Sequence, residues 1–280
     1  METQKPIRID MSDYEYAGEG ANGMSYNHRR DPDVMLKLYQ PGKVRQPLDE
    51  MLIARKVFAA GIPTPEPGDY VTDGIRYGIR FRRIRDKQSY ARAVGNHPED
   101  VVRYAEEFAR MCRELHATHV DTTVFECVKD RYFRLLEENP FFTSVEKDRL
   151  TRFIQDAPDT DTAIHGDLQF GNAIFAGDRR YFIDLGDFSY GYPLFDIGMV
   201  YSTPYLSAPE FVREAFHMEP ETALRFWQAF APVYFGTDRP LRDIEEEVRP
   251  FAGLKTIIIE RDMGVPMPSF REALKPVLQP

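Results

Sequence analysis

The sequence predicts an α+β fold with two lobes, a small β-rich first lobe and a larger, mostly helical second lobe. Residues 7–40 hold short apolar segments broken by Gly, Asn and Asp, which is typical of strands joined by turns. Beyond Asp86 the apolar residues recur at helical spacing. A chain of 280 residues with 42% apolar content can bury a large core, and this length favours two lobes. We therefore expect one domain over residues 1–85 and another over residues 86–280.

Composition narrows the class of protein. The net charge of −9 and the pI near 5.3 argue against nucleic acid as the main partner. Cys112 and Cys127 form neither a C-x-x-C pair nor a disulfide framework, which indicates a reducing compartment. No apolar run approaches the length of a membrane span, and residues 1–6 lack an apolar signal segment. We expect a cytoplasmic protein without a membrane or nucleic-acid partner; no feature of the sequence indicates its oligomeric state.

The first lobe contains a glycine-rich segment, Gly18-Glu19-Gly20-Ala21-Asn22-Gly23. A dinucleotide-binding fold would need a helix directly after it, but the residues that follow, including the apolar run from Val34 to Tyr39, predict strands. The segment is then either a plain hairpin turn or a hairpin that covers phosphates, because glycines let backbone N–H groups approach phosphate oxygens closely.

Two charged residues, Lys37 and Glu50, follow this segment in the sequence. Lys37, in an apolar strand, is either an edge residue whose amine reaches solvent or a phosphate-binding lysine. Residues 47–60 predict a helix that Gly61 ends, and its apolar positions recur at helical spacing: Leu48, Met51, Leu52 and Phe58. Glu50 on this helix is either a solvent-facing acid of the first turn or the ion-pair partner of Lys37.

The strongest chemical signal is the stretch His165-Gly166-Asp167-Leu168-Gln169-Phe170-Gly171-Asn172. A short strand, a turn at Gly177-Asp178 and a second strand follow, and the second strand delivers Asp184. Phosphoryl transfer needs a carboxylate that accepts the proton of an attacking hydroxyl, and oxygen ligands that hold magnesium. The H-x-D-L-x-x-x-N spacing matches a kinase catalytic loop, and Asp184-Leu185-Gly186 stands where D-F-G would. The alternative is a solvated hairpin with ordinary turn residues.

The spacing of apolar residues predicts that the second lobe is mostly helical. Helices are expected over residues 101–116, 124–138, 145–156, 209–216, 221–234 and 242–259. We expect the acidic run from Asp243 to Glu247 to be a solvent-exposed face of a helix. A cluster of aromatic residues is expected to belong to the core rather than to form a box for a quaternary ammonium group: Phe226, Trp227, Phe230, Tyr234 and Phe235. His116 and His119 are i, i+3 neighbours, but no third metal ligand accompanies them.

Taken together, these motifs resemble the aminoglycoside phosphotransferase and choline-kinase-like family, the small-molecule branch of the protein-kinase-like fold. The resemblance covers nearly the whole chain. Its most specific part is the H-G-D of residues 165–167 with Asn172 and Asp184, because H-G-D rather than H-R-D marks this branch. Further matches are the glycine segment, the Lys37 strand, the Glu50 helix with Gly61-Ile62-Pro63-Thr64-Pro65, the strand from Tyr77 to Ile84, Leu115-His116, and Gly191-Tyr192-Pro193-Leu194-Phe195-Asp196.

The resemblance implies an ATP-dependent transfer of the γ-phosphoryl group to a hydroxyl of a small molecule, with GTP as an alternative donor. It makes Asp167 the catalytic base and assigns Mg²⁺ to Asn172 and Asp184. It also implies the nucleotide site, which comprises Gly18, Gly20, Gly23, Lys37 with its partner Glu50, and the backbone around Phe81, Arg82 and Ile84. The last Asp of the Gly191 segment, Asp196, would support the catalytic loop from below.

Two departures from the family's pattern and two other classes of protein stay open. The family often has Trp or Phe after the metal-binding Asp, whereas this chain has Leu185. The strand from Tyr77 to Ile84 is unusually basic for its place, with Arg80, Arg82, Arg83 and Arg85 close together. A catalytically silent nucleotide-binding protein would share the fold, but the kinase residues are all present. A protein kinase is disfavoured because no long activation loop separates Gly186 from Pro193. The acceptor is open among aminoglycosides, choline or ethanolamine, sugars, amino alcohols and nucleosides.

Overall fold

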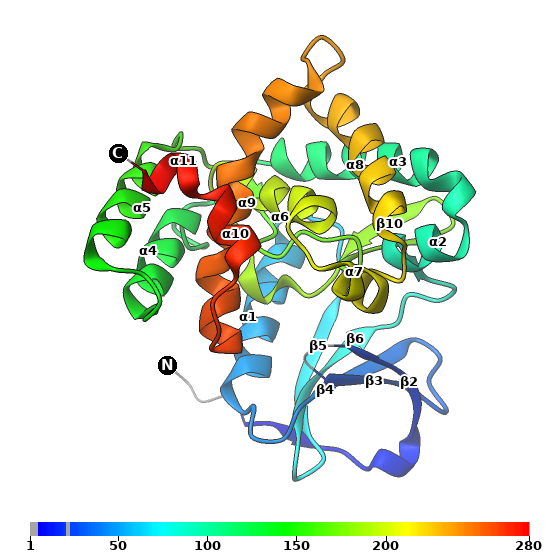
Figure 1. The fold of residues 1–280 in the computed structure, drawn as a ribbon. Helices are drawn as coiled ribbons and strands as arrows, with labels where there is room; N and C mark the ends of the chain where they lie inside the picture. The colour runs from blue at the N-terminus through cyan, green and yellow to red at the C-terminus, as the bar shows by residue number, and fades with distance from the viewer. Residues whose placement is uncertain (1–4, 21–22, 280) are drawn as a thin grey trace. The chain divides into compact units, whose positions relative to one another are not determined.

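The computed structural model describes residues 5–20 and 23–279 (Figure 1). The chain divides into two compact units, of which the first comprises Met1–Gln88 and Ile174–Asp187, and the second Ser89–Ala173 and Phe188–Pro280. The first is rich in strands and the second mostly helical, so the predicted fold class is confirmed. The segment Ile174–Asp187, which the sequence analysis assigned to the second lobe, belongs to the first unit by its contacts.

The first unit is built on a six-stranded sheet with the strand order β1-β5-β6-β4-β3-β2. Its strands are β1 (Ile7–Arg8), β2 (Tyr14–Gly20), β3 (Gly23–His28), β4 (Val34–Tyr39), β5 (Pro67–Thr72) and β6 (Tyr77–Arg82). β1 pairs with β5 in parallel, whereas the other neighbours are antiparallel. The glycine segment connects β2 to β3, so a strand follows it as predicted; its residues 21 and 22 lie outside the described residues.

Strand β4 presents different residues to the two faces of the sheet, because side chains alternate along a strand. Leu36 and Leu38 are buried in one apolar cluster. Tyr39 belongs to a second cluster with Met51 of helix α1 (Arg45–Ala59). Lys37 shares its face with Tyr39, and β4 lies between β3 and β6. Lys37 is therefore a residue of a central strand, and the edge interpretation is wrong.

Helix α1 begins two residues before the predicted start and buries a different stripe. Its buried residues are Pro47, Glu50, Met51, Ala54 and Val57. Leu52 and Phe58, which the helical spacing placed in the core, are 38% and 43% exposed. The predicted stripe was wrong because it counted only apolar residues, whereas Glu50 occupies a position of the buried face. Gly61 lies just past the helix with φ of +79°, a conformation that favours glycine.

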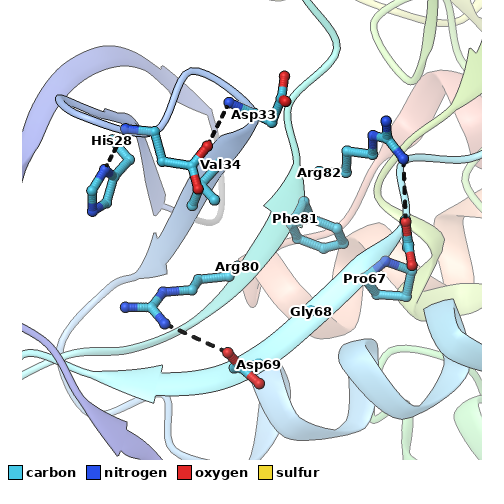
Figure 2. Close-up of a pocket in the computed structure, with 11 residues that line it drawn as sticks. His28, Asp33, Val34, Pro67, Gly68, Asp69, Arg80, Phe81 and Arg82 are labelled. Carbon is cyan, nitrogen blue, oxygen red and sulfur yellow. Dashed lines mark hydrogen bonds and ion pairs between the residues drawn. The ribbon is translucent and has the colours of Figure 1, made fainter.

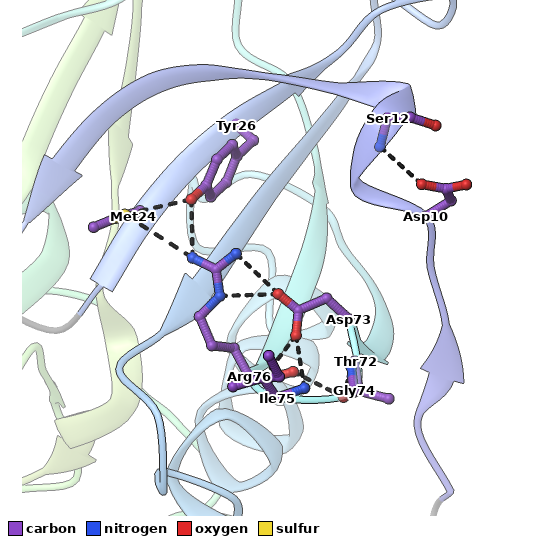
Figure 3. A network of polar contacts seen from close by, with 9 residues as sticks. All are labelled: Asp10, Ser12, Met24, Tyr26, Thr72, Asp73, Gly74, Ile75 and Arg76. Carbon is purple, nitrogen blue, oxygen red and sulfur yellow. Dashed lines mark hydrogen bonds and ion pairs between the residues drawn. The ribbon is translucent and has the colours of Figure 1, made fainter.

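A polar network closes the hairpin between β5 and β6 (Figure 3). Asp73 Oδ1 accepts the backbone N–H groups of Ile75 and Arg76 at 2.9 and 2.7 Å, and Arg76 Nε donates to Asp73 Oδ2 at 2.9 Å. Arg76 also donates to the hydroxyl of Tyr26 on β3 at 3.0 Å. Burial opposes the charge on Asp73, but these hydrogen bonds and Arg76 hold its pKa below the usual value. The Asp73-Gly74 turn therefore joins β5 to β6, and its charged network ties the hairpin to β3.

A second hairpin completes the first unit. It consists of β9 (Ala173–Ala176) and β10 (Arg179–Phe182), with Gly177 at φ of +57° in the turn. A 3-10 helix, η3 (Leu185–Asp187), follows. The strand–turn–strand pattern read from the sequence is thus confirmed, and Asp184 stands between β10 and η3.

The second unit contains helices α2 to α11. Their bounds are α2 (Tyr90–Asn96), α3 (Val101–His116), α4 (Val128–Glu138), α5 (Ser144–Asp156), α6 (Leu194–Tyr205), α7 (Pro209–Phe216), α8 (Pro220–Phe235), α9 (Leu241–Met263), α10 (Pro268–Ala273) and α11 (Lys275–Leu278). The short elements are β7 (Gln88–Ser89), β8 (Ala163–Ile164), β11 (Ser189–Tyr190), η1 (Met11–Asp13, in the first unit) and η2 (Pro98–Asp100). No helix within residues 5–20 and 23–279 is long and apolar enough to cross a membrane.

The sequence analysis did not predict helix α6. Nine of its twelve residues are buried, including Asp196 and Gly198. A helix that is apolar all round shows no amphipathic period, so its spacing gave no signal. Helix α4 was also misplaced, since it begins at Val128 and not at Val124.

Aromatic side chains form the core of the second unit. Phe108 of α3 packs against Phe226 and Phe230 of α8 at ring-centroid distances of 5.9 and 5.8 Å. Phe226, Trp227 and Phe230 are fully buried, so the prediction that they belong to the core is confirmed, and these rings cannot form a box for a ligand. The acidic run was misread in part, because Glu245 is half-buried and accepts a hydrogen bond from Trp227 Nε1 at 3.0 Å.

Helices α6 and α9 approach each other closely at Gly198. A Cβ atom on Gly198 would lie 2.7 Å from the backbone of both Phe251 and Ala252. Only glycine allows this distance between the two helix backbones. This close crossing holds α6 and α9 in register, so the side chains next to the contact on the two helices keep fixed positions relative to each other.

Candidate active site

In the first unit, a buried ion pair joins β4 to α1. Lys37 Nζ lies 2.9 Å from Glu50 Oε1, and the same amine contacts Asp184 Oδ1. The side chains of Lys37 and Glu50 are only 14% and 8% exposed. Burial disfavours the ammonium, but Asp184 and Glu50 outweigh it and raise the pKa of Lys37, so the amine stays charged. Glu50 therefore does not face solvent.

Tyr39 is a member of this group that sequence reasoning missed. Its hydroxyl donates to Glu50 Oε2, and its ring lies 4.9 Å from Lys37 Nζ. Burial raises the pKa of Tyr39, so the phenol keeps its proton and remains a donor. The signal was present in the sequence, because Tyr39 lies two residues after Lys37 on the same strand and must share its face.

Replacing Tyr39 by Phe should lower the free energy of unfolding by about 2 kcal/mol, since Glu50 loses a hydrogen bond to a buried charge. Urea unfolding measures this loss. Tyr70→Phe is the matched control, because the Tyr70 hydroxyl donates to the neutral carbonyl of Val44 at 2.9 Å. That change should cost about 1 kcal/mol. Equal losses in the two variants would show that Tyr39 does not hold the Glu50 carboxylate.

Asp184 has an unusual backbone conformation. Its φ is +59°, in the left-handed region that few residues other than Gly, Asn and Asp adopt. Strand β10 leads into this residue and is anchored by Phe182, whose N–H donates to Pro63 O at 2.8 Å. After it, Gly186 packs on α1, where a Cβ atom would lie 3.6 Å from the side chain of Glu50. The Asp184 side chain is 40% exposed, so its carboxylate contacts Lys37 and is still open to solvent.

The three glycines of the glycine segment differ in their surroundings. A Cβ atom on Gly23 would lie 2.1 Å from Leu38 O, so close packing on β4 already requires glycine there. Gly18 O accepts a hydrogen bond from Ser25 Oγ at 3.1 Å, which braces the hairpin. A Cβ atom on Gly20 would have no described neighbour within 4 Å. Gly20 is therefore the position among the three where packing supplies no reason for glycine.

The basic strand β6 is largely neutralised by acidic neighbours. Arg80 lies 3.5 Å from Asp69, and Arg82 lies 3.8 Å from Glu66. Arg85, just beyond the strand, lies 2.5 Å from Asp33. These ion pairs give three of the four arginines of this region acidic partners on β5, directly before it, or in the turn before β4.

A pocket of about 440 Å³ lies in the first unit where these ion pairs meet (Figure 2). Phe81 and Arg82 line it together with Asp33, Gly68 and Asp69. Ile84 lines a neighbouring pocket of about 500 Å³ with Arg83 and Arg179. The residues predicted to hold the adenine, Phe81, Arg82 and Ile84, thus lie at or just after the end of β6, and each of them lines one or both of these pockets.

In the second unit, the stretch from His165 to Asn172 forms a compact loop. His165 is fully buried, and the N–H of Asp167 donates to its Nδ1 at 3.3 Å. Asn172 Nδ2 donates to both the backbone carbonyl and the Oδ2 of Asp167, at 2.9 and 2.8 Å. Leu168 and Phe170 insert into the core, and the Phe170 ring lies 4.4 Å from that of Phe226. Leu168 and Phe170 thus anchor the loop in the core, and the hydrogen bond from Asn172 fixes the orientation of the Asp167 carboxylate.

Asp196 supports this loop from helix α6. Its carboxylate accepts the N–H groups of His165 and Gly166 at 2.6 and 2.8 Å, and His116 Nε2 lies 3.1 Å away. Asp196 is fully buried, which opposes its charge. The hydrogen bond from His116 and the nearby positive groups outweigh burial and lower the pKa of Asp196.

His116 and His119 each have a hydrogen-bonding partner of their own. His116 bridges Asp196 and the Tyr234 hydroxyl, at 3.1 and 2.6 Å. His119 is exposed and lies 2.6 Å from Asp161. Among the described residues, no three His, Cys, Asp or Glu side chains group as metal ligands.

The residues assigned to Mg²⁺ have suitable donor atoms. Asn172 uses its amide nitrogen on Asp167, which leaves its amide oxygen as the group for another partner. Asp184 offers a carboxylate that is open to solvent. Mg²⁺ prefers such oxygen ligands and keeps several waters of its own. Asn172 belongs to the second unit and Asp184 to the first.

The chain belongs to the phosphotransferase enzyme family, whose family model matches residues 5–231. No curated protein matches the sequence. The solved structures that share the fold include the following three. A choline/ethanolamine kinase family protein from Mesorhizobium loti has 17% identity, covers 95% of this chain and 85% of its own, and superposes with a TM-score of 0.55. A thermostable mutant of aminoglycoside phosphotransferase APH(4)-Ia with ADP and hygromycin B has 14% identity, coverages of 96% and 94%, and a TM-score of 0.62. Amicoumacin kinase hAmiN, in complex with AMP-PNP, Ca²⁺ and Ami, has 15% identity, coverages of 98% and 89%, and a TM-score of 0.57.

Proposed function

We propose that this protein is a kinase that transfers the γ-phosphoryl group of ATP to a hydroxyl of a small molecule in the cytoplasm. The observation that carries the proposal is the fixed Asp167 carboxylate, which Asn172 orients from one side and the His165 loop from the other. A carboxylate held in this way can orient an attacking hydroxyl and accept its proton. Family membership and the nucleotide complexes among the structural neighbours support the donor.

The proposed transfer needs few groups. The acceptor oxygen forms a bond to the γ-phosphorus while the bond to the oxygen that bridges to the β-phosphate breaks, and the hydroxyl proton passes to Asp167. Lys37, which Glu50 and Tyr39 hold in place, would bind the α- and β-phosphates and offset their charge. Asn172 and Asp184 would hold Mg²⁺, which supplies further neutralisation of the phosphates. Gly18, Gly20 and Gly23 would cover the phosphates, and the backbone at Phe81, Arg82 and Ile84 would hold the base.

The acceptor class follows from less specific features. The chain carries a net charge of −9, which suits a cationic compound such as an aminoglycoside or choline, although a sugar-like alcohol fits the same chemistry. Two of the structural neighbours are an aminoglycoside phosphotransferase in complex with hygromycin B and an amicoumacin kinase. We propose an acceptor among aminoglycoside-, choline- and sugar-like alcohols.

The decisive measurement is nucleotide consumption with ATP or GTP, with and without Mg²⁺, against a panel of aminoglycosides, choline, ethanolamine, amino alcohols, sugars and nucleosides. We expect turnover that needs both Mg²⁺ and one class of acceptor. Nucleotide binding without turnover for any acceptor would favour a catalytically silent protein. Phosphorylation of a generic protein substrate would favour a protein kinase, and the lack of nucleotide binding would refute the proposal.

A further inference from the structure

A buried lysine outside the motifs lies under the catalytic loop. Lys255 belongs to helix α9, beyond the residues that the family model matches, and its exposed fraction is 3%. Its amine donates to the backbone carbonyl of Gly166 at 3.3 Å and lies 5.9 Å from the centre of the Tyr132 ring. Gly166 is the residue directly before Asp167.

The peptide groups around Gly166 are therefore held from two helices. The N–H of Gly166 donates to Asp196 of α6, and its carbonyl accepts from Lys255 of α9. Gly166 has a φ of +88°, a conformation that glycine adopts easily, and the two hydrogen bonds hold the peptide groups on either side of it. The close crossing of α6 and α9 at Gly198 places Asp196 two residues before the contact and Lys255 one turn after it.

Packing alone does not explain a lysine at this position. Moving an ammonium group out of water costs several kcal/mol, and an apolar side chain of similar volume would fill the same space without that cost. Burial disfavours the charged amine here, but Tyr132, Asp196 and Asp167 outweigh it and raise the pKa of Lys255. The site thus maintains a positive charge whose hydrogen bond ends on the catalytic loop.

We propose that Lys255 is a positioning residue of the phosphoryl transfer: together with Asp196 it clamps the Gly166 backbone and so fixes where the Asp167 carboxylate points. The inference rests on the proposed role of Asp167. A displacement of a catalytic group by about 1 Å can cost about 100-fold in rate. Lys255 touches neither the acceptor nor the nucleotide in this role, so its loss should act on kcat and not on binding.

The test compares Lys255→Met, which removes charge and donor at similar length, with Lys255→Arg, which keeps both. Lys129→Met is the matched control, because Lys129 is 8% exposed and its amine also donates to backbone carbonyls, among them that of Gln155 at 3.0 Å. We expect Lys255→Met to lower kcat by about 100-fold with the KM for ATP within about twofold. Lys255→Arg should restore kcat to within about fivefold of the parent, and Lys129→Met should leave kcat unchanged within about twofold.

Unchanged kcat in Lys255→Met, or an equal loss in Lys129→Met, would overturn the proposal. If Lys255→Met does not fold, Lys255→Gln is held to the same criteria. Amide hydrogen exchange of the peptide covering residues 163–172 separates this inference from the proposed function, because it needs no turnover. Exchange should be faster by about tenfold in Lys255→Met and unaltered in Lys129→Met, even for a parent protein that shows no activity. Unaltered exchange in both variants would also refute the clamp.

Discussion

Replacing Asp167 by Asn should lower kcat by about a thousandfold, since an amide cannot accept the acceptor's proton. The substitution preserves shape, and Leu168 and Phe170 keep the loop anchored in the core. Nucleotide affinity should therefore stay within about twofold of the parent, because the change removes an interaction that matters in the transition state. Steady-state kinetics with the best acceptor measures kcat, and calorimetry with a non-hydrolysable ATP analogue measures affinity.

The control for this substitution is Asp178→Asn, which removes the same charge from an exposed turn of the β9–β10 hairpin. Its kcat should equal that of the parent protein. Should Asp167→Asn retain more than about a tenth of the parent kcat, Asp167 is not the catalytic base. A loss of nucleotide affinity in step with kcat would instead indicate that the substitution disturbs binding.

The second large effect is expected for Asp196→Asn, which should lower the free energy of unfolding by about 3 kcal/mol. The carboxylate accepts the N–H groups of His165 and Gly166 and contacts His116. His165 and His116 are buried, and Gly166 is half-buried. An amide in its place turns a donor toward one of these groups and removes the charge that His116 and Lys255 face. Urea unfolding measures the loss, and Asp243→Asn on the exposed face of α9 should change stability by less than about 0.5 kcal/mol.

The pH dependence gives a further check on Asp196. Its pKa in the folded protein is lowered from the ordinary value of 3.8, so its contribution to stability is complete above that value and is lost as the pH falls through the folded pKa. The stability difference between the parent and Asp196→Asn should stay constant from about pH 7 to about pH 5 and shrink below about pH 4. A difference that grows in acid would contradict a lowered pKa.

Patterns of short range determined much of what was predicted. Short apolar segments broken by turn residues identify β2 to β4, and the helical period identifies α1, α3 and α5, because local propensity favours each of these elements. The spacing of residues 165–172 singled out Asp167 and Asn172 as candidate site residues, and the strand–turn–strand pattern after them singled out Asp184. Helix α6 gave no such signal, because a helix buried on all sides has no polar face.

The tertiary structure decided the rest through contacts between distant residues. Glu50 is buried because β4 turns Lys37 and Tyr39 toward α1, and no helical period can reveal that an acid faces inward. Lys255 lies 89 residues from Gly166, and only the crossing of α6 and α9 at Gly198 brings the two together. The sequence by itself determined the fold class and singled out the candidate site residues, because these depend on residue type and short spacing. Which charges are buried, and what holds the loop, depend on packing between helices that are remote in the chain.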